Sequence, residues 1–239
     1  MKNITPYHSK ESKKTQISSM FNRIAKTYDL LNRILSFGMD QFWRKKAIQK
    51  INNKPNKILD IATGTADLAI IAAHNTDAKI IGVDISKEML KKGYEKIKKR
   101  KLTQRISLKL ADAEHLPFKE NSFQAITAGF GVRNFENLDL GLLEMHRVLE
   151  EKGVLIIIEP SKPTIFPIKQ IYYLYFNYVL PLLGKFISKE NYAYNYFIKS
   201  VNEFPSSNKL IEKLNQIGFK DCQQIPLTFG IVSLYIAKK

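Results

Sequence analysis

The stretch KILDIATGTADL, residues 57–68, decides the fold of this chain. Its first five residues form an apolar run typical of a buried strand, and the apolar-rich segment 66–74 is typical of a helix. A turn of small residues with one glycine, Gly64, lies between them. A strand, a tight turn and a helix in this order often hold a nucleotide. The rest of the sequence has to indicate which nucleotide this is.

The same alternation of strand and helix continues along the chain. Further strands are expected at 78–84, 106–112, 122–130 and 153–160, and helices at 86–100 and 138–150. Five strands joined by helical crossovers predict an α/β fold with an open parallel sheet and helices on both faces. The last two strands, 219–227 and 230–239, are too close together for a crossover. They are expected to form an antiparallel pair that completes a seven-stranded, mostly parallel sheet.

The N-terminal region precedes this alternation and has a helical pattern. Residues 1–15 are polar and rich in lysine, so we expect a flexible basic tail there. Apolar side chains recur at helical spacing through 16–36, and a second helix is expected at 40–52. These N-terminal helices form a cap, 16–54, on a single domain that spans 16–239.

An aromatic, apolar helical insertion, 165–204, interrupts the alternation near the C-terminus. Its apolar residues on one helical face are Ile168, Ile171, Tyr172, Tyr175, Phe176 and Val179. The polar residues between them argue against a membrane span. Two interpretations stay open, which are a core helix packed on the sheet and an apolar lid or groove for a long greasy substrate.

Composition excludes several classes of protein. One cysteine, Cys222, excludes an intrachain disulfide and a multi-cysteine metal site, which fits a reducing, cytoplasmic compartment. The four histidines lack ligand spacing, so no metal is expected. The N-terminus has no apolar signal segment, and no apolar run is long enough to span a membrane. The net charge of +16 fits an anionic membrane face, nucleic acid, an acidic substrate or simple compositional drift.

The turn after the first strand favours S-adenosylmethionine (SAM) over other nucleotides. A dinucleotide site needs three glycines to approach a pyrophosphate, and a phosphate-binding P-loop needs G-K-[ST], but this turn has only Gly64. Asp84 ends the second strand twenty residues after Gly64, where a carboxylate can accept both ribose hydroxyls of SAM. Asp112 follows the third strand, within reach of adenine. Asp60 and the Gly64–Thr65 turn are left for the amino-acid part of SAM.

Seven motifs carry a resemblance to a known family. They are MFNRIAKTYDLLNRILSFGMDQFWRK (20–45), LDIATGTADL (59–68), GVDIS (82–86), ADAEHLPF (111–118), FGVRN (130–134), EMHRVL (144–149) and IEPSKP (158–163). With these motifs the chain resembles the menaquinone/ubiquinone biosynthesis C-methyltransferases from about residue 18 to its end. The resemblance implies a Rossmann-like class I methyltransferase fold. Leu31 stands where the family usually has methionine, Asp40 where it usually has histidine, and RVLEEKG (147–153) replaces the usual R-V-L-K-P-G-G turn.

The resemblance also implies roles for single residues. It assigns SAM binding to Thr65, Asp84, Asp112 and Ala113, with Gly129 where the fourth strand meets the cofactor. Arg133 and Asn134 are the candidates to orient or stabilise an oxygen of the substrate. Tyr28 and Asp29 are expected to close over SAM. His115 and His146 are interpreted as surface or packing residues.

The activity implied by the resemblance is SAM-dependent C-methylation of demethylmenaquinol. Methylation of a ubiquinone precursor, or of both substrates, stays open as an alternative, and an RNA or phospholipid methyltransferase is a more distant one. The expected partners are a prenylated quinol and, transiently, the inner face of a membrane, with no nucleic acid. Against RNA, the aromatic residues gather in an apolar helix instead of alternating with basic residues on strands. The oligomeric state is left open.

Overall fold

A computed structural model describes residues 4–7, 9–179 and 191–239, and its centre is one seven-stranded sheet. The strands are β1 (Lys57–Ile61), β2 (Lys79–Asp84), β3 (Ile106–Leu110), β4 (Phe123–Gly129), β5 (Leu149–Pro160), β6 (Lys220–Leu227) and β7 (Val232–Lys238). Their order is β3-β2-β1-β4-β5-β7-β6. Neighbours from β3 to β5 pair in parallel, while β7 runs antiparallel to both β5 and β6. The predicted sheet, including its antiparallel C-terminal pair, is confirmed.

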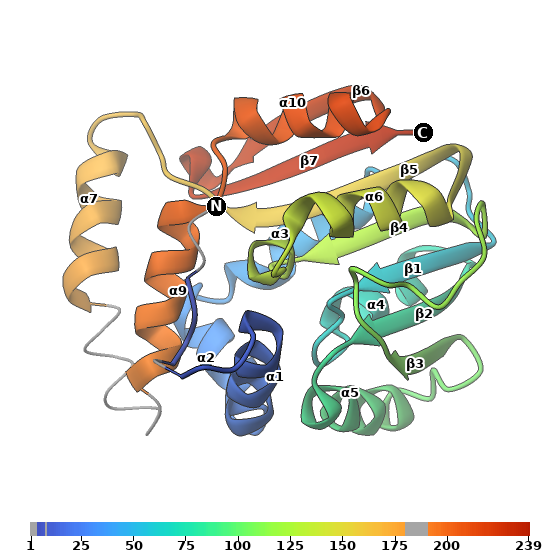
Figure 1. Cartoon of the computed structure of the whole chain (residues 1–239), viewed down its shortest axis with the longest axis horizontal. Helices are drawn as coiled ribbons and strands as arrows, with labels where there is room; N and C mark the ends of the chain where they lie inside the picture. The colour runs from blue at the N-terminus through green and yellow to red at the C-terminus, as the bar shows by residue number, and fades with distance from the viewer. Residues whose placement is uncertain (1–3, 8, 180–190) are drawn as a thin grey trace.

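Helices cover both faces of this sheet (Figure 1). Their bounds are α1 (Lys13–Ile24), α2 (Tyr28–Leu35), α3 (Met39–Ile48), α4 (Asp67–Asn75), α5 (Lys87–Lys99), α6 (Leu138–Val148), α7 (Ile168–Leu174), α9 (Asn191–Glu203) and α10 (Ser207–Ile217). One apolar core joins the sheet to α6 and α10, and the other joins it to α3 and α4. The strand order reverses between β1 and β4, so a crevice is expected at the carboxyl ends of these strands.

The N-terminal cap differs from the prediction because two helices replace the single helix expected at 16–36. Thr27 ends the first helix by donating its N–H and its hydroxyl to the Ile24 carbonyl, at 3.0 and 3.3 Å. The helix also begins earlier than expected, because the Ser12 hydroxyl accepts a hydrogen bond from the Thr15 N–H at 3.2 Å. Residues 13–15, which were expected to belong to the flexible tail 1–15, are therefore part of α1.

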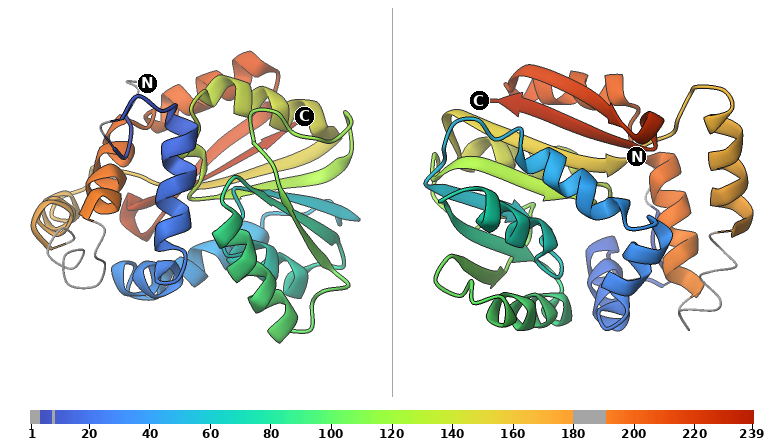
Figure 2. Two further views of the ribbon diagram at one scale, coloured as in Figure 1. Left: turned by 60° about the horizontal axis from the view of Figure 1, so that its bottom comes forward. Right: turned by 180° about the vertical axis from the view of Figure 1, so that it is seen from behind.

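The insertion does not pack on the sheet. α7 stands at the far left of the molecule with α9 beside it, and the view from behind shows the same arrangement (Figures 1 and 2). A short π-helix, η2 (Tyr175–Val179), continues α7, and residues 180–190 lie outside the described residues. The interpretation of this segment as a core helix on the sheet is therefore wrong. The sequence analysis also missed α10.

Candidate active site

The turn after β1 is tight because three of its residues have left-handed backbone conformations. Gly64 has φ +55°, and Ala62 and Ala66 have φ +52° and +65°. Small side chains keep the cost of these conformations low and leave room for neighbouring backbone. A Cβ on Gly131 would lie 2.4 Å from the Cβ of Ala62, so this glycine lets the segment after β4 approach the turn. Sequence and packing thus explain the small-residue turn.

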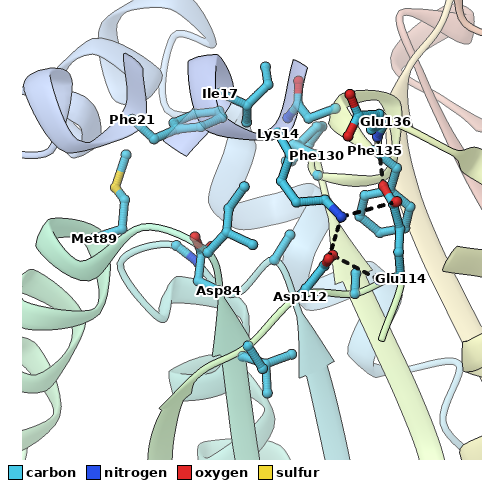
Figure 3. A pocket seen from close by; sticks show the side chains of 18 of the residues that line it. Lys14, Ile17, Phe21, Asp84, Met89, Asp112, Glu114, Phe130, Phe135 and Glu136 are labelled. Carbon is cyan, nitrogen blue, oxygen red and sulfur yellow. Dashed lines mark hydrogen bonds and ion pairs between the residues drawn. The ribbon is translucent and has the colours of Figure 1, made fainter. Parts of the chain in front are cut away.

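A polar cavity lies at the carboxyl ends of β1, β2 and β4, next to the strand-order reversal. Six of the residues predicted to act in the site line it, namely Gly64, Asp84, Asp112, Ala113, Gly129 and Asn134. Ile17 and Phe21 from α1, together with Met89 from α5, add apolar surface (Figure 3). The cavity therefore has acidic side chains and an apolar wall within one small space.

Backbone N–H groups fix the carboxylate of Asp84 in this cavity. Its Oδ2 accepts from the Gly64 N–H and its Oδ1 from the Ser86 N–H, both at 2.8 Å. Burial raises the pKa of Asp84, and these hydrogen bonds oppose the shift. The Asp84 carboxylate keeps further lone pairs that can accept hydrogen bonds from a ligand.

Helix α1 covers the opening of the polar cavity. The Lys14 ammonium reaches from this helix to form ion pairs with Asp112 and, at 3.3 Å, with Glu114 (Figure 3). The neighbouring Lys13 is buried and donates a hydrogen bond of 2.6 Å to the Phe135 carbonyl. The cavity beneath α1 has a volume of about 60 Å³, and Lys14, Ile17 and Phe21 of this helix form its outer wall.

Two of the predicted SAM ligands, Asp60 and Thr65, are not among the residues that line this cavity. Asp60 is 1% exposed and accepts hydrogen bonds from the hydroxyls of Thr63 and Thr127, both at 2.6 Å. Thr127 stands directly opposite Asp60 in the register of β1 and β4, so the carboxylate supports the turn from beneath. The Thr65 hydroxyl donates to Asp29 at 2.5 Å and faces away from the cavity.

A second, largely apolar cavity of about 520 Å³ lies beside the first. Its walls come from α1, α2, α3, α7, η2, α9 and the turn η3 (Thr228–Gly230). Apolar residues that line it include Met20, Leu31, Leu35, Trp43, Ile168, Ile171, Phe176 and Phe197. The N-terminal helices and the insertion therefore enclose one apolar space, and this arrangement favours the lid-or-groove interpretation of the insertion.

The two cavities meet at four residues that line both. These residues are Phe21, Tyr28, Phe130 and Asn134. The Oδ1 atom of Asn134 is buried and has no hydrogen-bond partner among the described residues. Buried polar atoms without a partner are rare and indicate a position where a ligand can bind. The prediction for Asn134 thus coincides with the junction of the two cavities.

Arg133 lines the apolar cavity, but its guanidinium is already engaged. Nη1 pairs with the fully buried Glu159 carboxylate at 2.9 Å and also donates to the Phe130 carbonyl. The guanidinium also lies 5.1 Å from the ring centre of Phe197. Burial raises the pKa of Glu159, and the charge of Arg133 opposes that shift. In this geometry Arg133 holds a buried ion pair, while its Nε, like the Oδ1 of Asn134, is buried without a hydrogen-bond partner among the described residues.

Of the remaining predicted residues, only Tyr28 is among those that line the two cavities. Tyr28 lines both cavities, as a residue that closes over a ligand would, whereas Asp29 pairs with Lys96 at 2.8 Å, away from them. His146 packs edge-on against Phe219 and His115 is exposed. The sequence analysis missed Lys14, and it also missed Arg44, a buried arginine in the wall of the apolar cavity.

Comparisons with known proteins show the family of this chain. The profile described as the ubiE/COQ5 methyltransferase family matches residues 9–239. Demethylmenaquinone methyltransferase from Bacteroides fragilis is 44% identical over 238 residues, covering 99% of this chain and 97% of that protein. The ubiquinone/menaquinone biosynthesis C-methyltransferase UbiE from Citrifermentans bemidjiense is 43% identical, covering 94% of this chain and 96% of that protein.

A solved structure confirms the predicted fold class. The crystal structure of a SAM-dependent methyltransferase from Aquifex aeolicus superposes with a TM-score of 0.61 at 16% identity, covering 83% of this chain and 90% of that chain. At this identity the likeness concerns the fold alone, while the activity class rests on the family match. By that match, over nearly its whole length, the chain belongs to the ubiE/COQ5 methyltransferase family.

Proposed function

We propose that the enzyme methylates a ring carbon of demethylmenaquinol, with SAM as the methyl donor, to form menaquinol. The observation that carries the proposal is the contact between a polar cavity and a large apolar one at Tyr28 and Asn134. A methyl donor with a polar nucleoside fits the first cavity, and a quinol with an apolar prenyl tail fits the second. The names of the relatives in Bacteroides fragilis and Citrifermentans bemidjiense support the same substrate class.

The residues of the polar cavity fit the chemistry of SAM. The Asp84 carboxylate suits the two ribose hydroxyls, and Asp112 with the backbone at Ala113 suits adenine. The Gly64 turn and Gly129 border the space left for the methionine part. When bound, SAM supplies an electrophilic methyl group on a sulfonium.

Asn134 and the apolar walls account for how the acceptor ring is positioned. The unpartnered Asn134 Oδ1 can accept a hydrogen bond from a quinol hydroxyl and so orient the ring beside the donor cavity. The apolar walls hold the tail and exclude water from the ring. Such alignment is able to supply on the order of 7–11 kcal/mol of the barrier reduction.

A competition assay tests the substrate assignment. The enzyme is given SAM with equal amounts of a demethylmenaquinol and the matching demethylated ubiquinol precursor, and the products are separated by mass spectrometry. We expect a gain of one methyl group on the naphthoquinol. A gain on both quinols would establish a dual-specificity enzyme. A gain on neither, with methylation of a phospholipid amine or RNA offered in parallel, would overturn the proposal.

We also propose that the mouth of the apolar cavity docks on an anionic membrane surface. Phe37 and Phe229 line this cavity, yet their side chains are 80% and 67% exposed. Both have left-handed backbones, at φ +51° and +56°, which costs a bulky residue roughly 1–2 kcal/mol. Exposed aromatic rings held in strained turns around one opening support contact with a lipid interface.

Exposed basic residues in the elements that form this cavity support the choice of an anionic lipid surface. Lys45 and Lys46 lie in α3 and Lys169 in α7, and Lys162 precedes the insertion. Each such lysine near a membrane surface contributes about 1 kcal/mol of attraction. None of the helices in the described residues combines the length and the hydropathy that a membrane crossing requires. The proposed contact is therefore peripheral and places the cavity next to a lipid-soluble substrate.

A further inference from the structure

Arg44 is a buried cation whose hydrogen-bond donors are unused. The residue is 5% exposed, and its Nε atom is buried without a partner. Among the described residues its guanidinium makes no hydrogen bond, and the closest carboxylate oxygen, Asp40 Oδ2, lies 3.8 Å from Nε. Buried charged groups are normally both paired and hydrogen-bonded. The free donors of Arg44 therefore call for a ligand.

Asp40 balances this charge without occupying the donors. Its carboxylate accepts a hydrogen bond from the Ser36 hydroxyl at 3.2 Å and from the Gln41 amide at 3.0 Å. It also pairs with the half-exposed Arg33, whose Nε lies 3.4 Å away. Asp40 and Ser36 themselves line the apolar cavity, and these contacts hold the carboxylate in place beside Arg44. Loss of the Arg44 guanidinium would leave Asp40 with three partners.

Arg44 stands at the wall between the two cavities. It lines the apolar cavity, and its guanidinium carbon lies 5.0 Å from the centre of the Phe130 ring. A Cβ built on Gly129, which lines the polar cavity, would lie 3.0 Å from Nη1 of Arg44. The other arginine of the apolar cavity, Arg133, already donates to Glu159. Arg133 also has a buried Nε without a partner, but its charge is paired with the Glu159 carboxylate, whereas the guanidinium of Arg44 makes no hydrogen bond among the described residues.

We propose that Arg44 binds the ring oxygen of the acceptor quinol as its anion. This inference rests on the proposed function. The hydroxyl proton leaves to water, and the oxygen pushes electron density onto the neighbouring ring carbon. That carbon forms a bond to the methyl group as the bond from sulfur to methyl breaks, which leaves a thioether. The ring carbon then releases its own proton, which restores the aromatic ring as its anion, and the ring oxygen takes a proton back from water, so that one methyl group has replaced one hydrogen.

The guanidinium of Arg44 acts on the first of these reaction steps, the ionisation of the hydroxyl. A fixed positive charge beside the oxygen favours its anionic form, and it does so strongly in a site from which water is excluded. Arg44 thereby lowers the pH at which the quinol hydroxyl ionises. Asp40 is a positioning residue, because it acts only by holding the guanidinium.

Kinetics of R44Q and R44K test the proposed role of Arg44 in binding the quinol anion. The matched control is R33Q, because Arg33 also pairs with the Asp40 carboxylate but does not line the cavity. In R44Q we expect kcat at pH 7 to fall on the order of 10²–10³-fold. The loss should shrink as pH rises, because the hydroxyl then ionises without help. R44K should retain part of the activity, and R33Q should resemble the unmodified enzyme. Thermal unfolding shows that each variant is folded.

Two binding measurements keep the inference separate from the proposed function. By calorimetry, R44Q should bind SAM within about twofold of the unmodified enzyme, because Arg44 lies outside the polar-cavity lining. A hydroxynaphthoquinone that is anionic at neutral pH should lose at least about tenfold in affinity, while a neutral naphthoquinone should not.

Three results would overturn the role of Arg44. They are an equal loss of kcat at every pH, an equal loss of affinity for the two naphthoquinones, and a loss confined to SAM affinity, which would assign Arg44 to the SAM carboxylate. Failure of the unmodified enzyme to methylate any quinol would instead overturn the proposed function, and the naphthoquinone comparison would still decide the role of Arg44.

Discussion

At the residue scale, Asp60 carries a carboxyl group that the fold keeps away from water beneath the turn after β1. Burial raises the pKa of this carboxyl from 3.8 to about 6, against the effect of the hydrogen bonds from Thr127 and Thr63. Because the folded protein holds this proton more tightly than the unfolded chain, stability falls as pH rises from about 4 to about 6. A shift of about two pKa units corresponds to about 3 kcal/mol.

Urea unfolding of D60N between pH 4 and 6.5 checks this expectation. The stability of D60N should decline less with pH than that of the unmodified protein, by about 3 kcal/mol across the interval. The control D77N alters an exposed aspartate and should follow the unmodified protein closely. Parallel curves for all three proteins would contradict the account of Asp60.

The sequence predicts some of these residues and not others for a physical reason. Asp84, Asp112 and Gly129 are found because the boundaries of apolar runs locate the ends of strands. The position of the Asp60 side chain outside the cavity lining was not predictable, because its direction depends on Thr127, a residue far along the chain in another strand. Arg44 was not predicted because it becomes buried only where segments that are distant in the sequence come together around the apolar cavity.

At the element scale, α1 acts as a cover on the polar cavity, held by the ion pairs of Lys14 with Asp112 and Glu114. K14M removes these pairs and should let SAM associate about two to five times faster, since partly exposed pairs are worth up to about 1 kcal/mol. Stopped-flow fluorescence measures this rate. Added salt should accelerate the unmodified enzyme and leave K14M unchanged.

A matched control for this prediction is K10M, which removes an exposed lysine just before α1. It should bind SAM at the rate of the unmodified enzyme. If K14M associates no faster than K10M, the ion pairs of α1 do not control access to the polar cavity.

The elements themselves differ in how far the sequence predicts them. The parallel strands are found because their apolar runs are long and separated by helical patterns. The break between α1 and α2 is hidden because apolar spacing continues across 25–27, and only the hydrogen bonds of Thr27 end the helix. α10 was missed, although Leu210 and Leu214 lie on one face and Gly218 ends the helix in a left-handed conformation.

At the scale of the whole molecule, the strained aromatic turns relate membrane binding to stability. F37G and F229G replace residues at positive φ by glycine, so the backbone becomes less strained by about 1 kcal/mol each. We expect the thermal midpoint to stay constant or rise, while flotation with anionic vesicles falls. Most binding by the unmodified protein should be lost at high salt.

The control for this prediction is Y94A, which removes an exposed ring on α5 that lines neither cavity. It should float with the vesicles as the unmodified protein does. Binding that is insensitive to both glycine substitutions and to salt would contradict the proposed docking surface. Equal binding to neutral vesicles would remove its electrostatic part.

The overall architecture was predictable because the alternation of strands and helices and the family motifs all indicate one fold. The junction of the two cavities was not, because it is built from α1, α2, η1 (Val132–Asn134) and β4, which only the folded chain brings together. The account as a whole depends on that junction, since it is where a methyl group has to pass from donor to acceptor.

The most direct test follows the methyl group itself. The enzyme is incubated with SAM whose methyl group carries deuterium and with demethylmenaquinol, and the label in the product is located by fragmentation in a mass spectrometer. The account predicts one labelled methyl group on a ring carbon and both ring oxygens free. A label on oxygen, or an unlabelled quinol recovered from an enzyme that binds SAM, would contradict it.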